Sequence, residues 1–98
     1  MRMEKEVPIG DKRGMHLRVI QTFVMKAQEF SSQIRVQSPT AKADGKSPIE
    51  MMLLKGSPGT KLKLIAEGED AREALEALAG FISNPEPQAA PGEGNTMP

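Results

Sequence analysis

The sequence predicts a two-layer α/β sandwich, in which a mainly antiparallel sheet is covered by helices on one face. Apolar and polar residues alternate in four short segments, which is the periodicity of β-strands. Two longer segments carry apolar residues at helical spacing, and a third, short segment begins with a helix-capping pattern. These segments follow one another in the order β-α-β-β-α-β-α, and their short links favour antiparallel pairing of the strands.

In the first half of the chain, we expect one strand at a sheet edge. Pro8 lies in the first alternating segment and cannot donate a hydrogen bond to a neighbouring strand, so this strand is placed at the edge. A polar loop over residues 10–14 follows it. The expected elements are a strand over residues 3–9, a helix from His16 to Phe30, a strand over residues 33–38 and a short return strand over residues 41–43.

The second half contains two predicted capping boxes. Ser47 and Glu50 form the first, and Asp70 and Glu73 form the second. The expected elements are a short, very apolar helix from Pro48 to Leu54, a strand over residues 61–66 and a helix over residues 71–82. From Asn84 the chain is rich in Pro and Gly and nearly free of apolar side chains, so residues 1–83 are expected to form the domain and residues 84–98 a disordered tail.

Composition excludes several classes of function. The 98 residues include one histidine and no cysteine, so neither a disulfide framework nor a metal site is expected. With zero net charge, three Phe and no Tyr or Trp, the chain lacks the basic field and the aromatic platforms that bind nucleic acid. No segment is apolar enough to insert into a membrane, and no signal peptide is recognisable. We expect a cytoplasmic protein.

The single histidine, His16, stands where the first helix is predicted to begin. From Arg13 to Gln21 there is no Ser, Thr, Asp or Asn to cap the helix, so its first N–H groups are left for water or an anion. Arg18 lies in the first turn, where a cation opposes the helix dipole unless it meets an anion. The pattern suggests that His16 carries a phosphoryl group and that Arg18 stabilises it. An ordinary surface histidine is the alternative, because short motifs often match by chance.

The chain resembles the HPr family, the histidine-containing phosphocarrier proteins of the bacterial phosphotransferase system. Three segments carry the resemblance, in the same order and spacing as in that family: Gly-Met-His-Leu-Arg at 14–18, Lys-Ser-Pro-Ile-Glu-Met-Met-Leu-Leu at 46–54, and Ala-Glu-Gly-Glu-Asp-Ala at 66–71. It covers about residues 3–82 and implies an open-faced sandwich of four strands in the order 1-4-2-3, with three helices on one face.

The resemblance also implies a function and partners. His16 would accept a phosphoryl group on Nδ1 from phosphorylated enzyme I and pass it to a downstream acceptor protein. Arg18 and the backbone N–H groups of Leu17 and Arg18 would bind the phosphate. Such a protein is a carrier and not an enzyme, needs no cofactor or metal, and is expected to be a monomer.

A second implied site is the segment that begins at Ser47. HPr kinase/phosphorylase phosphorylates this serine in many family members, whereas the alternative is that Ser47 serves only as the helix cap. Exposed Ile49 and the rim charge Lys46 are expected to contact partner proteins, together with Gln21 and Met25 of the first helix. Met51, Met52 and Leu54 are expected nearer the core.

The chain departs from the family pattern beside the histidine. Leu17 replaces a small residue, and Val19 and Ile20 stand where the family has Pro and then a small residue. These departures leave a second function open, a regulatory binding module that transfers no phosphate and is controlled through Ser47. A metabolite-binding sandwich is a third possibility, although nothing in the sequence identifies a ligand.

Overall fold

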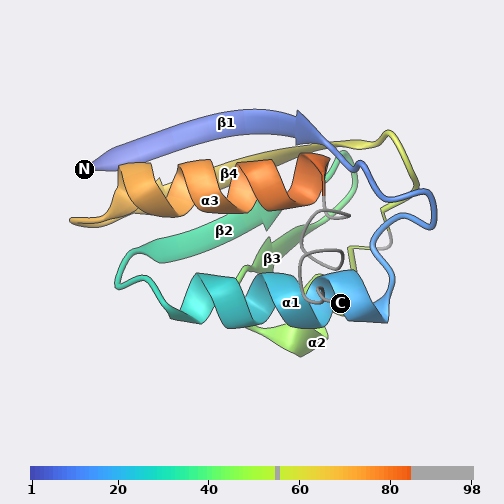
Figure 1. The fold of residues 1–98 in the computed structure, drawn as a ribbon, viewed down its shortest axis with the longest axis horizontal. Helices are drawn as coiled ribbons and strands as arrows, with labels where there is room; N and C mark the ends of the chain where they lie inside the picture. Colours follow the sequence, from blue (N-terminus) through green and yellow to red (C-terminus); the bar gives the residue numbers. More distant parts are fainter. Residues whose placement is uncertain (55, 85–98) are drawn as a thin grey trace, which may run out of the picture.

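The computed structural model describes residues 1–54 and 56–84 and shows a four-stranded sheet with helices on one face (Figure 1). The elements are β1 (Arg2–Pro8), α1 (Leu17–Gln28), β2 (Gln33–Gln37), β3 (Lys42–Asp44), α2 (Pro48–Met52), β4 (Lys61–Glu67) and α3 (Ala71–Ser83). All strand pairs are antiparallel, and the order in the sheet is β1-β4-β2-β3. The predicted fold class and strand order are therefore confirmed. The expected tail lies outside the described residues except for Asn84.

The sheet places β4 at its centre and β1 at one edge. β4 pairs with β1 from Glu67 opposite Arg2 to Lys61 opposite Pro8, and with β2 on its other side. The edge position predicted for the Pro8 strand is thus correct. Ile65 of β4 is buried outside the core cluster, between Glu4 of β1 and Arg35 of β2, its partners on the two neighbouring strands.

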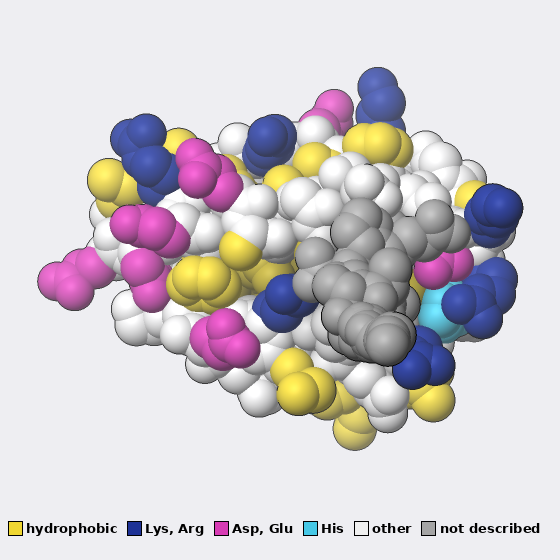
Figure 2. Space-filling view, in the orientation of Figure 1, with side chains coloured by type: hydrophobic (Ala, Val, Ile, Leu, Met, Phe, Trp, Pro, Cys, Tyr) yellow, Lys and Arg dark blue, Asp and Glu magenta, His cyan; other side chains and the backbone are white. Residues whose placement is uncertain are grey.

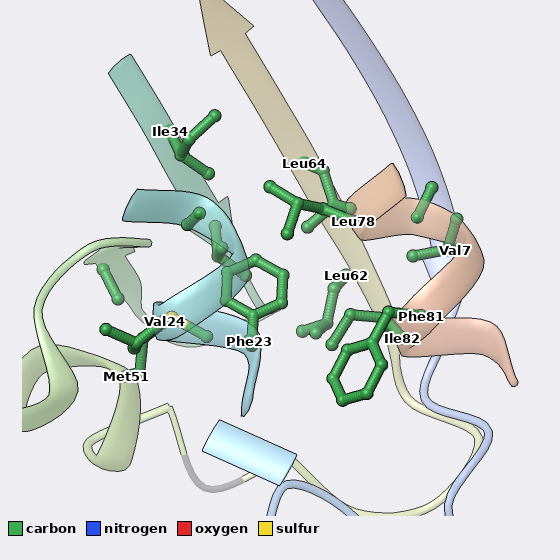
Figure 3. Packing of buried hydrophobic residues seen from close by; sticks show 14 of the residues in the cluster. Val7, Phe23, Val24, Ile34, Met51, Leu62, Leu64, Leu78, Phe81 and Ile82 are labelled. Atoms are coloured by element: carbon green, nitrogen blue, oxygen red, sulfur yellow. The ribbon is translucent and has the colours of Figure 1, made fainter. Parts of the chain in front are cut away.

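The hydrophobic core fills the space between the sheet and the helices. Figure 3 shows the Phe23 ring of α1 in the middle of this core, with Leu62 and Leu64 of β4 and Leu78 of α3 close by. All four side chains are fully buried. Because burial of a large apolar side chain contributes about 1.5–3 kcal/mol, these contacts fix α1 against the sheet and with it the position of its first turn.

The helix boundaries differ slightly from the expected ones. α1 begins one residue after His16 and ends at Gln28, and α2 ends at Met52 rather than at Leu54. Met51 and Leu54 are buried, as expected, but Met52 is 50% exposed, so its predicted core position is wrong. The reason is geometric, since residues three apart share a face of a helix and the residue after the first of them points elsewhere.

The capping box of α2 is only half formed. The Ser47 hydroxyl accepts a hydrogen bond from the N–H of Glu50 at 3.3 Å, which confirms Ser47 as the cap. The Glu50 carboxylate does not return to Ser47. It accepts from the N–H of Asp44 at 2.8 Å, and so joins α2 to the end of β3.

The second predicted capping box, at α3, is wrong. The Asp70 side chain makes no cap hydrogen bond. Its carboxylate accepts from the N–H groups of Ser31 and Ser32, each at 2.9 Å, and from the Ser32 hydroxyl. Three donors of the α1–β2 loop thus compete successfully with the first turn of α3, and the pKa of Asp70 falls to about 2, mainly through the hydrogen bond from the Ser32 hydroxyl.

Candidate functional site

The loop between β1 and α1, which ends at His16, lies at one end of the molecule beside the segment that leads into β4 (Figure 1). This loop is held by backbone hydrogen bonds, each of 2.9 Å. The Ile9 N–H donates to the Thr60 carbonyl, the Gly10 N–H to the Ile82 carbonyl, and the Met15 N–H to the Gly56 carbonyl. The loop is therefore fastened to the end of α3 and to the segment before β4, so the position of His16 is set by the fold.

Two residues before His16 determine how the loop turns into the helix. Gly14 has a φ of 76°, a conformation that L side chains rarely adopt, and an added Cβ would lie 2.4 Å from the Gly56 oxygen. Met15 is buried against the core. With Met15 directed inward, the next residue is brought to the surface, and the His16 side chain is 21% exposed.

The first turn of α1 has free backbone donors. His16 is the N-cap residue, with φ −84° and ψ 172°, and makes no side-chain cap hydrogen bond. The first bond of the helix runs from the Ile20 N–H to the His16 carbonyl at 3.0 Å. Within residues 1–54 and 56–84, the N–H groups of Leu17 and Arg18 have no acceptor. These donors point out of the helix start, where the helix dipole favours an anion.

The charges around the imidazole are mostly positive. Figure 2 shows the histidine at the right-hand end of the molecule, between Lys and Arg side chains. Lys12, Arg13 and Arg18 are exposed, and Arg18 pairs with no carboxylate in the described part of the chain. An imidazole, free N–H groups and an available guanidinium together suit a phosphate group. The described residues contain no cluster of three or more His, Cys, Asp or Glu side chains that would hold a metal ion.

One acidic residue of the site was missed by sequence analysis, which treated residues 10–14 only as a polar loop. Asp11 lies beside His16, with 3.2 Å between Asp11 Oδ2 and His16 Nε2. Its Oδ1 accepts from the N–H of Arg13 at 2.8 Å. The pKa of Asp11 is lowered chiefly by this backbone hydrogen bond, and further by His16, while desolvation opposes the shift. Asp11 is the only carboxylate between Glu6 and Glu29, and this isolation was the one available signal.

The structure places the Ser47 segment away from His16, beside the other end of α1. Lys46 Nζ donates to the Phe30 carbonyl at 2.6 Å, and the Gln28 side-chain amide donates to the Lys46 carbonyl at 3.4 Å. Lys46, expected as a charge at the rim of a docking surface, is thus hydrogen-bonded to the end of α1. The helix α1 has 12 residues and is about 18 Å long. The two candidate sites lie at its opposite ends.

Exposed apolar side chains lie on α1 and α2 between those two sites. Figure 2 shows hydrophobic side chains along the lower edge of the molecule, where Figure 1 places α2. Three expected partner-binding residues are exposed, namely Gln21, Met25 and Ile49, the last by 74%. We call the exposed apolar side chains here the exposed apolar surface, which consists of Leu17, Met25, Ile49, Met52 and Leu53.

Comparisons with known proteins agree with this architecture. The family model described as "PTS HPr component phosphorylation site" matches residues 3–84. The phosphocarrier protein HPr of Borreliella burgdorferi is 40% identical over 82 residues, which are 84% of this chain and 95% of that protein. The crystal structure of HPr from Bacillus anthracis superimposes with a TM-score of 0.79 at 32% identity, covering 83% of this chain and 96% of the other.

The chain is also similar to Crh, an HPr-like protein. The crystal structure of Crh from Bacillus subtilis, a dimer with a swapped domain, has a TM-score of 0.66 at 37% identity and covers 80% of this chain and 90% of the other. In the described residues, no helix has both the length and the hydropathy to cross a membrane. Because the family model spans most of the chain and the fold is the same, the chain belongs to the HPr family of the phosphotransferase system, whose phosphocarrier members are carriers rather than enzymes.

Proposed function

We propose that His16 is the phosphoryl carrier of this protein. In this proposal Nδ1 accepts the phosphoryl group from phosphorylated enzyme I and passes it to a downstream acceptor protein. The observation that carries the proposal is the position of His16 at a helix start where the N–H groups of Leu17 and Arg18 meet no acceptor from the described residues.

The physical argument concerns charge and positioning. Phosphoryl transfer needs little covalent chemistry from a protein beyond alignment and stabilisation of the phosphoryl oxygens. The N–H groups of Leu17 and Arg18 would donate to those oxygens, and the Arg18 guanidinium would balance their charge. A partly exposed imidazole is accessible to a donor protein and to an acceptor protein in turn.

The test is phosphorylation by enzyme I and phosphoenolpyruvate. The intact protein is expected to gain one acid-labile phosphate, detected by mass spectrometry, and His16→Ala is expected to gain none. Glu76→Ala, an exposed position on α3 outside the proposed site, is the matched control and should still be labelled. If the protein gains no phosphate while a known HPr is labelled in the same mixture, the proposal is wrong.

We further propose Ser47 as a regulatory position for HPr kinase/phosphorylase. Its hydroxyl caps α2, so Ser47→Ala is expected to lose both the kinase label and about 1 kcal/mol of stability. A kinase that labels a known HPr but not this chain would leave Ser47 with the role of a cap alone.

The exposed apolar surface, together with Gln21, is the proposed docking site for enzyme I, the acceptor protein and the kinase. It includes Ile49 and Met25. The protein is proposed to act as a cytoplasmic monomer.

A regulatory module that transfers no phosphate is the second candidate function. It is favoured by the exposed Leu17 beside His16, 54% exposed where the family has a small residue, and by the similarity to Crh. Labelling of Ser47 by the kinase, without labelling of His16 by enzyme I, would favour this regulatory module.

A further inference from the structure

We propose that Asp11 is a positioning residue that holds the proton of His16 on Nε2 and leaves the lone pair on Nδ1. The atom that receives the phosphoryl group rests on the function proposed above, whereas the position of the proton does not.

The contact between the two side chains is set by the loop. Asp11 Oδ2 lies 3.2 Å from His16 Nε2, and the two side chains are only 13% and 21% exposed. The second carboxylate oxygen is held by the Arg13 N–H at 2.8 Å. The Asp11 carbonyl accepts from the Gly14 N–H at 2.9 Å, which closes the turn around the carboxylate. Asp11 is thus held by hydrogen bonds to both its carboxylate and its backbone carbonyl.

The chemistry of the pair determines which nitrogen carries the proton. An ionised carboxylate only accepts hydrogen bonds, and the backbone hydrogen bond from Arg13 keeps the pKa of Asp11 low, so that it is ionised near neutral pH. His16 Nε2 is therefore the donor. A neutral imidazole has one proton, so Nδ1 is left as the nucleophile.

This arrangement also simplifies the transfer step. The Nδ1 lone pair forms the new N–P bond, and the electron pair of the broken bond to phosphorus stays with the donor's leaving nitrogen. The ring need not lose a proton, because Nε2 keeps its proton and donates it in a hydrogen bond to Asp11 throughout the step. The positive charge that the ring gains on phosphorylation then lies next to the carboxylate.

The substitution Asp11→Asn tests the assignment. The Asn oxygen can still accept from the Arg13 N–H, which turns the NH₂ group toward Nε2 and favours the tautomer with the proton on Nδ1. With ¹⁵N-labelled histidine at alkaline pH, the Nε2 resonance of the intact protein is expected in the protonated range. In Asp11→Asn, Nδ1 is expected there instead, and the rate of labelling by enzyme I should fall about tenfold or more.

The matched control is Lys12→Gln, which removes a neighbouring charge from the same loop without touching the ring. It is expected to retain the tautomer and most of the labelling rate, and both variants should unfold at the urea concentration of the intact protein. An unchanged tautomer in Asp11→Asn, or an unchanged labelling rate, would overturn the proposal. If the tautomer reverses but enzyme I labels not even the intact protein, the positioning role stands and the proposed phosphate donor is wrong.

Discussion

Gly14 offers a direct test of how the loop before His16 is built. Its φ of 76° lies in the left-handed region, which costs an L residue about 1–2 kcal/mol. An added Cβ would also lie 2.4 Å from the Gly56 oxygen. That oxygen is part of the backbone and accepts from the Met15 N–H, so it cannot rotate away. Relief of such a clash costs about 1–3 kcal/mol, so Gly14→Ala should lose about 3 kcal/mol in total.

Two other glycines separate the contributions to that loss. Gly59 has a φ of 83°, and no atom of the described residues lies within 4 Å of an added Cβ, so Gly59→Ala should lose only the conformational part, about 1 kcal/mol. Gly80 lies in α3 with equally open space, so Gly80→Ala should gain about 0.5–1 kcal/mol from helix propensity.

Urea unfolding of the three variants gives the free energies of unfolding. The expected order of stability is Gly80→Ala, the intact protein, Gly59→Ala and then Gly14→Ala. Because the shifted loop carries His16, Gly14→Ala should also be labelled more slowly by enzyme I than Gly59→Ala. If Gly14→Ala were as stable as Gly59→Ala, the close packing of this loop on the Gly56 carbonyl would be refuted.

The remaining predictions concern packing, pH and charge. Met51→Ala should lose about 2–4 kcal/mol in urea unfolding because Met51 is fully buried, whereas Met52→Ala should lose less than about 1 kcal/mol; equal losses would contradict the placement of α2. The pKa of Asp70 is about 2 in the folded protein against an ordinary 3.8, so its contribution to stability is complete above pH 3.8 and is lost as the pH falls toward 2. The loss of stability in that range, followed by circular dichroism, should be smaller in Asp70→Asn, and an identical slope would argue against the Ser32 contact. Arg18→Ala should slow labelling by enzyme I about tenfold or more while stability changes by less than about 0.5 kcal/mol, and a rate equal to that of the intact protein would exclude Arg18 from the phosphate site.

Periodicity predicted the elements because each one buries one face. The inward residues of β4 and the apolar stripe of α3 are local patterns, and Leu62, Leu64, Leu75 and Leu78 are all buried as those patterns indicate. Strand order is not a local property. It was implied by the family resemblance and not by the alternation of residues.

The predictions from sequence failed where a contact depends on the tertiary fold and not on neighbouring residues. Asp70 has the sequence pattern of a cap, but the N–H groups of Ser31 and Ser32 approach it from another part of the fold. Asp11 meets His16 only because the loop turns at Gly14, and a five-residue spacing outside a regular element predicts no contact. In α2, the helix is too short for its apolar residues to show which face is buried, so Met52 was misplaced.

The atom that we propose to carry the phosphoryl group is His16 Nδ1. NMR of the protein with ¹⁵N-labelled histidine, after phosphorylation by enzyme I and phosphoenolpyruvate, identifies this atom. We predict that Nδ1 alone shows a coupling to ³¹P and that Nε2 keeps its proton. A ³¹P coupling on Nε2, or a phosphate on any residue other than His16, would show that Nδ1 is not the carrier atom.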